Sequence, residues 1–182
     1  MLRLQFLSPA SLSFPIAEEL YTEAFPPAER RPLKAWRQLA DSESAFQIFE
    51  ILSEERFVGF VSSWQMDHFV YLEHFAILPT ERSHGLGSAC IELLKEKFSR
   101  QPLVLEAEPP ETLLAQRRIA FYERCGFSVS PRGYLQPPYR PGSPWFPLQL
   151  LCTDAHFLEE QFEEVRNNIY RSVYQQEAPL SE

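Results

Sequence analysis

The chain has 182 residues, a length that suits one domain with a full hydrophobic core, and we expect residues 1–182 to form a single domain. Apolar residues make up 45% of the sequence and charged residues 23%, which is typical of a globular protein and excludes a disordered one. The formal net charge is −8, and an acidic surface repels phosphate backbones, so we expect no nucleic-acid partner.

The cysteines and the N-terminal segment indicate the compartment. Cys90, Cys125 and Cys152 are widely spaced and form no C-x-x-C pair, so we interpret them as buried free thiols in a reducing environment. The segment Met1 to Gln5 becomes polar too early for a signal peptide, and no apolar run approaches the ~18 residues of a membrane span. We therefore expect a cytoplasmic protein with no membrane association.

The first half of the chain is predicted to begin with a strand and two helices and to continue as an antiparallel meander. Alternating apolar and polar residues predict the first strand, strand-like runs separated by polar turns predict the next three, and the two prolines at 26 and 27 are expected to end the first helix. The predicted elements are a strand over 2–6, helices over about 14–24 and 28–40, and strands over 46–52, 57–64 and 70–78.

After Pro79 the apolar residues recur at helical spacing, and Gln101-Pro102 is expected to end that helix. The next helix is predicted to have Leu114, Phe121 and Cys125 on one side. Thr153 or Asp154 can cap the last helix. The predicted elements are helices from about 85 to 98, from about Leu114 to Cys125 and over about 154–174, and strands over 103–107, 127–129 and 146–152.

The most informative segment is the turn Arg82-Ser83-His84-Gly85-Leu86-Gly87, which lies between a predicted strand and a predicted helix. A helix N-terminus presents unpaired N–H groups and a positive dipole end, glycines allow a phosphate to approach the backbone, and arginine adds a charge. The pattern predicts a pyrophosphate-binding turn; the alternative is a turn that needs two small residues. It is neither a P-loop nor a complete dinucleotide fingerprint.

This segment resembles the acetyl-CoA-binding motif of the GNAT superfamily of N-acetyltransferases, R/Q-x-x-G-x-G/A. A second block, the strand over 103–107 followed by Phe121-Tyr-Glu-Arg-Cys-Gly-Phe127, is similar to the family's strand and its F-Y-x-x-x-G-F motif. The resemblance covers Tyr71 to Val129. It implies an α+β (mixed α/β) fold, with a central, mostly antiparallel, splayed sheet and helices on both faces. The last helix, over about 154–174, is an addition to this pattern.

The resemblance also implies where acetyl-CoA, the expected cosubstrate, binds. The backbone of Phe75, Ala76 and Ile77 would pair with the pantetheine arm as if adding a strand, and the Ala76 N–H would be an oxyanion donor. His84 would contribute only its backbone N–H. The cofactor-binding residues are therefore expected to be Phe75, Ala76, Ile77, Arg82, Ser83, His84, Gly85, Leu86, Gly87 and Ser88.

The sequence departs from the family pattern in the second block. Many relatives have Asn seven residues before the motif tyrosine and Ala four before it, and here these positions are Ala115 and Arg118. The CoA contact of that Asn is therefore in doubt. Arg117 or Arg118 is an alternative partner for a CoA phosphate, and solvated arginines on a helix surface are the competing interpretation.

Acetyl transfer to an amine requires a base, an oxyanion donor and a proton for the leaving thiolate. Tyr122 is the candidate general acid, because a phenol stays protonated at neutral pH and the family places this tyrosine near the CoA sulfur. The alternative is a core tyrosine bonded to backbone. Glu106 and Glu73 are the candidate bases, since each is a carboxylate within an apolar strand, and Glu106 resembles the base position of ribosomal-protein N-terminal acetyltransferases. Ion pairs with His74 or an arginine, or a water chain without a single base, are the alternatives.

No His or Cys has a partner at metal-ligand spacing, so we expect no metal. The acceptor pocket is expected from the segments 25–31 and 134–145. Phe25, Tyr134, Tyr139 and Trp145 are candidates for an aromatic wall, and Arg30 or Arg31 for holding a carboxylate; rigid loops and solvated arginines are the alternatives.

The sequence thus predicts an N-acetyltransferase that moves acetyl from acetyl-CoA to a primary amine of a small molecule or a peptide N-terminus, by direct attack in a ternary complex. The alternative function is a non-catalytic acyl-CoA-binding regulatory module, which would keep the turn at Arg82 but would not need Tyr122. The sequence leaves open whether the last helix mediates a homodimer.

Overall fold

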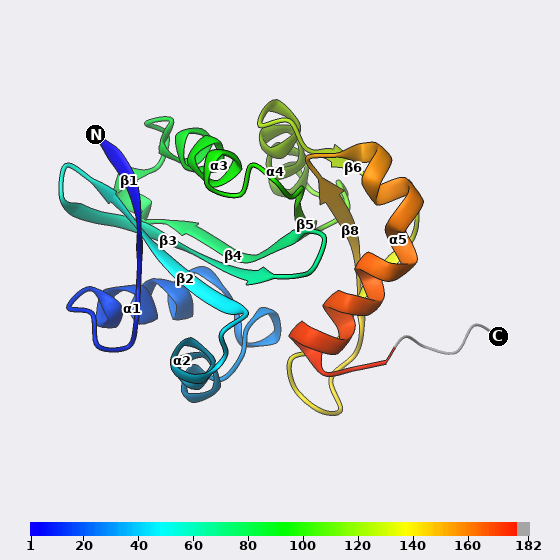
Figure 1. Cartoon of the computed structure of the whole chain (residues 1–182), viewed down its shortest axis with the longest axis horizontal. Helices are drawn as coiled ribbons and strands as arrows, with labels where there is room; N and C mark the ends of the chain where they lie inside the picture. The colour runs from blue at the N-terminus through cyan, green and yellow to red at the C-terminus, as the bar shows by residue number, and fades with distance from the viewer. Residues whose placement is uncertain (178–182) are drawn as a thin grey trace. The chain divides into compact units, whose positions relative to one another are not determined.

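The structure, a computed structural model, describes residues 1–177 (Figure 1). The chain forms two compact units, one over Met1–Gln101 and one that begins at Pro102. Each unit is a sheet of antiparallel strands covered by helices, which is the mixed α/β fold that the sequence predicts. The single domain expected over 1–182 stays a prediction. The two units are described separately.

The first unit has its strands in the order β1-β2-β3-β4, with every neighbouring pair antiparallel, so the predicted meander is confirmed. Figure 1 shows α1 and α2 on one side of these strands and α3 on the other. The elements are β1 (Leu2–Phe6), α1 (Phe14–Ala24), α2 (Leu33–Ser42), β2 (Phe46–Ser53), β3 (Arg56–Gln65), β4 (Val70–Ile77) and α3 (Leu86–Lys97), with short 3-10 turns at Pro27–Glu29 and Pro79–Glu81.

Aromatic side chains hold α1 and α2 against the sheet. The Trp36 ring of α2 stacks with two rings of α1, with centroids 4.4 Å from Tyr21 and 5.5 Å from Phe14, and makes an edge-type contact with Phe60 of β3 at 5.7 Å. All four side chains are buried. Rings at these separations add a specific attraction to the burial of apolar area, so the stack fixes the two ends of the connection between the helices.

The second helix begins later than predicted. It starts at Leu33 and not near Ala28, and Pro32 is its N-terminal cap residue. A proline disfavours helical backbone in the residue before it, so Arg31 cannot continue a helix from the short turn at 27–29. The connection therefore runs extended through Arg30, with φ −147° and ψ 158°.

Strand β4 carries an irregularity beside the predicted cofactor segment. In the register with β3, Ser62 pairs with His74 but Ser63 pairs with Leu72, so Glu73 is the extra residue of a β-bulge. Four residues after Glu73, Ile77 pairs with Gly59, where a Cβ atom would lie 2.3 Å from the Ala76 carbonyl oxygen. Only glycine permits this close approach of the two strands.

The second unit is organised around β8, which pairs antiparallel with β5, β6 and β7. In the view of Figure 1, α4 and α5 lie on either side of β5 and β8. The elements are β5 (Leu103–Ala107), α4 (Leu113–Arg124), β6 (Ser128–Val129), β7 (Tyr134–Gln136), β8 (Phe146–Cys152), α5 (Ala155–Ile169) and a π-helical turn, η3 (Tyr170–Tyr174).

The helices of this unit have side-chain caps at their N-termini. Thr112 accepts a hydrogen bond from the Ala115 N–H at 3.1 Å, and Asp154 accepts one from the Phe157 N–H at 2.9 Å. The predicted apolar side of α4 was partly wrong, because Leu114 is 65% exposed and Ile119 is buried in its place. The predicted last helix corresponds to α5 followed by η3. Strand β7 and the π-helical geometry of η3 had no sequence-based prediction.

The three cysteines are buried and free, as predicted. Among residues 1–177, no helix is long and apolar enough to cross a membrane. The same residues contain no group of three or more His, Cys, Asp or Glu side chains that could hold a metal ion.

Candidate active site

The predicted phosphate turn is an exposed loop that leads directly into α3. Gly85 is the N-terminal cap residue of α3, and its φ of +76° lies in the left-handed region that favours glycine. Ser83 also has a positive φ, +67°. Among the described residues, no neighbouring atom lies within 4 Å of the place where a Cβ of Gly85 would stand. The backbone here is therefore open to a ligand from outside.

The N–H groups at the start of α3 have little competition from other described groups. The first N–H of α3 to bond within the helix is that of Ala89, to the Gly85 carbonyl at 3.1 Å, and no described side chain caps the helix N-terminus. The Nε of Arg82 donates to the Ile77 carbonyl at 3.0 Å, which fixes the guanidinium beside the turn. Exposed N–H groups, a helix dipole and a fixed cation suit a pyrophosphate, so these residues fit the group predicted to bind here.

The predicted pantetheine segment is the end of β4. Phe75 pairs with Val61 and Ala76 with Phe60 of β3, and Ala76 is buried while Phe75 and Ile77 are half-buried. The bulge at Glu73 on one side and the close approach at Gly59 on the other set the position of this segment. The structure thus gives Phe75–Ile77 an ordered backbone, which a strand-like partner requires.

Glu73, a predicted base, is held in a buried ion pair. Its side chain is 0% exposed and bonds to the Arg31 guanidinium, whose side chain is 8% exposed, and to the Trp64 indole N–H at 2.8 Å. Burial alone would raise the pKa of Glu73. Arg31, His74 and the Trp64 hydrogen bond together outweigh burial, so the pKa of Glu73 lies below its ordinary value. This environment favours a permanent carboxylate.

The connection between α1 and α2 is fastened to β4 rather than left free for an acceptor. His74 Nε2 lies 3.0 Å from the Glu29 carbonyl, and the Arg31 N–H donates to the Tyr21 hydroxyl at 3.0 Å. Burial lowers the pKa of His74, which keeps its ring neutral near pH 7. Arg30 donates through Nε to the Phe25 carbonyl at 2.8 Å. Both arginines predicted to hold an acceptor carboxylate therefore have partners within the first unit.

Tyr122, the predicted general acid, lies on α4 and is half-buried. Its ring contacts Phe121 at 5.1 Å and Phe127 at 5.5 Å between centroids, both edge-on. These contacts fix the ring between the helix and the strand that follows it. A phenol held by its ring in a partly accessible position can donate a proton, so the predicted role of Tyr122 stays a prediction that the geometry permits.

Glu106, the other predicted base, lies at the centre of a hydrogen-bond network in the second unit. The Tyr134 hydroxyl donates to Oε1, and Oε2 accepts from Gln136 Nε2 at 2.5 Å and from the Tyr174 hydroxyl at 2.8 Å. Burial and the Glu106 charge raise the pKa of Tyr134 well above its ordinary value, so its phenol remains a donor. Gln136 and Tyr174 were not predicted, because they are 30 and 68 residues away in sequence.

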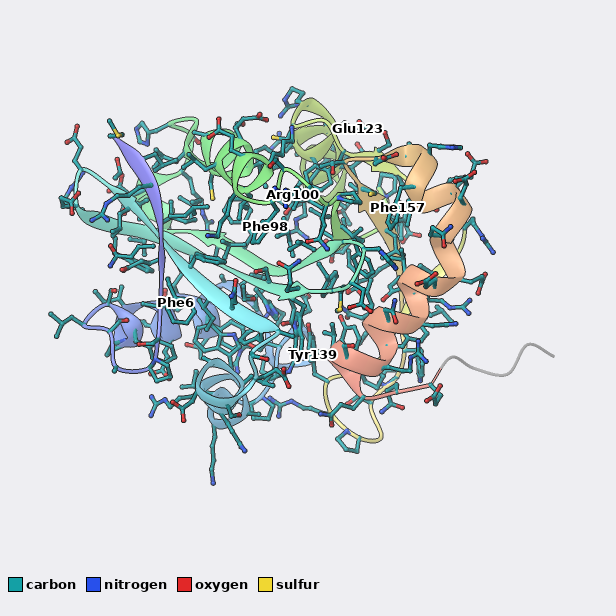
Figure 2. All side chains as sticks on the ribbon, viewed as in Figure 1. Phe6, Phe98, Arg100, Glu123, Tyr139 and Phe157 are labelled. Carbon is teal, nitrogen blue, oxygen red and sulfur yellow. The ribbon has the colours of Figure 1, made fainter. Side chains whose placement is uncertain are left out.

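Three of the four residues predicted as an aromatic wall extend this network. The Tyr139 ring lies 5.0 Å from Tyr174, and Figure 2 shows Tyr139 next to the C-terminal end of α5. The Tyr170 ring lies 5.6 Å from Tyr134 and 5.4 Å from Trp145. Phe25, the fourth, lies in the first unit and contacts His74 at 4.5 Å.

The arginines of α4 are exposed. Arg118 forms an ion pair with Glu108 at 2.9 Å, and the two side chains are 42% and 48% exposed. Such pairs contribute little to stability. This geometry agrees with the interpretation of Arg118 as a solvated helix residue, and Arg117 is exposed on the same helix.

Comparison with known proteins gives one family and several structural relatives. The model of the acetyltransferase (GNAT) family matches residues 14–127. A Bacteroides thetaiotaomicron protein assigned to the GNAT family of acetyltransferases is 35% identical, with a TM-score of 0.90 over 94% of this chain and 98% of its own. No curated protein matches the chain.

Two more distant structures share the fold. The ribosomal-protein-S18-alanine N-acetyltransferase from Escherichia coli has 20% identity and a TM-score of 0.59, over 84% of this chain and 92% of its own. Arabidopsis thaliana NAA60, solved in complex with acetyl-CoA, has 15% identity and a TM-score of 0.62, over 84% and 97%. The family model and the 35% identical relative show that this chain is an acyltransferase enzyme that belongs to the GNAT family of acetyltransferases.

Proposed function

We propose that the protein transfers the acetyl group of acetyl-CoA to a primary amine of a small molecule or a peptide N-terminus, by direct attack within a ternary complex. The observation that carries this proposal is the turn before α3, where Gly85 has a φ of +76° and an open approach beside uncapped helical N–H groups. In a chain of this family, such a turn suits the pyrophosphate of acetyl-CoA.

The proposed roles follow from the donors and acceptors of each side chain. The N–H groups from Gly85 to Ser88 and the Arg82 guanidinium hold the phosphates, and the backbone of Phe75–Ile77 orients the pantetheine arm. Glu106 takes the proton of the acceptor ammonium, which makes the amine nucleophilic. We prefer Glu106 to Glu73 as the base, because Arg31 stabilises the charged form of Glu73.

The remaining steps balance the transfer. The amine nitrogen forms a bond to the thioester carbonyl carbon while the Ala76 N–H stabilises the oxyanion, and the carbon–sulfur bond then breaks. Tyr122 donates its hydroxyl proton to the leaving thiolate. The acylated nitrogen then loses its second proton through solvent, which reprotonates the Tyr122 phenolate, and Glu106 releases the first proton to water. No group on the enzyme becomes acetylated in this scheme.

The proposal is tested first by calorimetric titration with acetyl-CoA. We expect binding in the micromolar range for the wild type and at least a tenfold loss for Gly85→Glu, which adds bulk and a like charge at the phosphates. Gly142→Glu is the matched control, because Gly142 also has a positive φ, +80°, and open surroundings, but lies in another loop. No binding by the wild type, or an equal loss in both variants, would overturn the phosphate site.

Turnover is tested by thiol release from acetyl-CoA in the presence of a library of primary amines. We expect Tyr122→Phe to keep its acetyl-CoA affinity and to lose most of its turnover, since only the proton donor is removed. A wild type that binds acetyl-CoA but acetylates no amine would favour the regulatory module. A cytoplasmic location belongs to this proposal and is supported by the three buried free thiols.

A further inference from the structure

The C-terminal turn η3 brings a side chain directly onto the Glu106 carboxylate. Tyr174 donates to Oε2 at 2.8 Å and accepts from Gln136 Nε2, also at 2.8 Å, while Gln136 donates to the same Oε2 at 2.5 Å. The three groups form a closed triangle in which every donor has an acceptor. Such a network fixes the orientation of its members more firmly than isolated hydrogen bonds do.

The backbone of η3 explains how Tyr174 reaches this position. The segment Tyr170–Tyr174 is π-helical, a rare geometry that occurs often at functional sites, and it ends at Gln175 with a positive φ of 54°. Tyr170 donates to the Leu135 carbonyl, and Leu135 lies between Tyr134 and Gln136 on β7. The turn thus contacts the β7 backbone through the Tyr170 hydroxyl and Glu106 through the Tyr174 hydroxyl, and both contacts lie within the second unit.

We infer that η3 is part of the catalytic apparatus, with Tyr174 acting as a positioning residue that holds Glu106 as an oriented carboxylate for a primary ammonium acceptor. This inference rests on the proposed function for the role of Glu106 as the base and for the identity of the acceptor. Hydrogen bonds donated to a carboxylate favour its charged form, and a charged, fixed carboxylate can bind an ammonium and then accept its proton. The aromatic rings of Tyr139 and Trp145 beside η3 suit a cationic ligand as well.

The inference is tested by following the Glu106 carboxyl directly. In protein labelled with ¹³C-glutamate, the Glu106 signal is assigned by its loss in Glu106→Gln, and its titration midpoint is measured by NMR. We expect Tyr174→Phe, which keeps the ring and removes the donor, to raise this midpoint by about one pH unit. Tyr170→Phe is the matched control, since it removes a hydroxyl of the same turn that bonds to a neutral carbonyl, and it should leave the midpoint in place.

Equal midpoints in wild type and Tyr174→Phe would overturn the inference, and so would equal shifts in both variants, because packing alone would then explain the effect. Thermal melting checks that each variant is folded. If Tyr174→Phe does not fold, Gln136→Met breaks the triangle from β7, and an unmoved midpoint there refutes the inference in the same way.

Turnover separates this inference from the proposed function. If the midpoint shifts but the wild type acetylates no primary amine, the coupling of Tyr174 to Glu106 stands and the proposed activity fails. If amines are acetylated, kcat/KM is measured as a function of pH. The acidic limb of this pH profile should move to higher pH in Tyr174→Phe by the same amount as the NMR midpoint. A limb that stays in place in an active Tyr174→Phe variant refutes the role of Tyr174.

Discussion

The buried ion pair between Arg31 and Glu73 makes the sharpest stability prediction. The two side chains are 8% and 0% exposed, and Arg31 also lies over the Trp64 ring at 5.6 Å. Arg31→Met keeps most of the aliphatic packing and removes the cation. Breaking a buried pair from one side costs about 3–5 kcal/mol, because the remaining charge stays buried without its partner.

Protonation of Glu73 limits this cost and gives it a pH dependence. Burial is the largest single influence on the pKa of Glu73, and Arg31 is the largest opposing one, so removal of Arg31 should raise the pKa of Glu73 above its ordinary 4.5. Keeping the carboxyl protonated costs about 1.4 kcal/mol per pH unit above that value, or about 3 kcal/mol at pH 7.

The wild type and the variant should therefore respond to pH in opposite directions. In the wild type the pKa of Glu73 is lowered, so its contribution to stability is complete above pH 4.5 and is lost as the pH falls through the folded-state pKa. In Arg31→Met the raised pKa makes the folded state bind a proton more tightly, so stability falls as the pH rises above 4.5. The difference between the two proteins should grow steadily from pH 4.5 to 7.

Urea denaturation followed by tryptophan fluorescence at several pH values measures this difference. The double variant Arg31→Met/Glu73→Gln should lose the pH slope and be more stable at pH 7 than the single variant. Arg37→Met is the control, because Arg37 also pairs with a glutamate, Glu18, but is 56% exposed, and its loss should be far smaller. A difference that is independent of pH would refute the reasoning.

Two further predictions concern the packing of the fold. Gly59→Ala should lower the free energy of unfolding by about 1–3 kcal/mol, because the alanine Cβ would lie 2.3 Å from the Ala76 carbonyl oxygen. The loss should appear as a lower Tm, and a Tm equal to that of the wild type would contradict this prediction. Burial raises the pKa of Cys90 to about 12, and it is the largest influence that raises the pKa of Cys152 to about 11. Both thiols should therefore stay unreactive towards a disulfide reagent at pH 8 until the protein is denatured. Rapid labelling of native protein would show that they are accessible.

Local sequence signals predicted much of the fold and of the phosphate turn. Strand-like apolar runs separated by polar turns predicted the meander from β2 to β4, and the pattern from Arg82 to Gly87 predicted a glycine-containing turn before a helix, because these features depend on neighbours in sequence. The sequence does contain a signal for the late start of α2, because Pro32 disfavours helical backbone at Arg31. The helix predicted from about residue 28 did not take this proline into account.

The partners of the two carboxylates could not be predicted in the same way. Arg31 is 42 residues from Glu73, and Tyr174 is 68 residues from Glu106, so no spacing rule connects them. An apolar strand containing one glutamate indicates that the carboxylate needs a partner, but it does not say whether that partner is a cation or a set of neutral donors. The assignment of one carboxylate as base depends on this distinction.

Glu73 therefore has a structural role that any kinetic test must separate from catalysis. As the bulge residue it shifts the register of β4 against β3, and Gly59 brings the same strand close at Ala76, so both act on the backbone of Phe75–Ile77. Substitution of Glu73 can therefore lower the affinity for acetyl-CoA through the geometry of β4, even where Glu73 is not the catalytic base. A fall in kcat with unchanged acetyl-CoA affinity and unchanged Tm would identify Glu73 as the base, whereas a joint fall in affinity and Tm would place its effect in the strand.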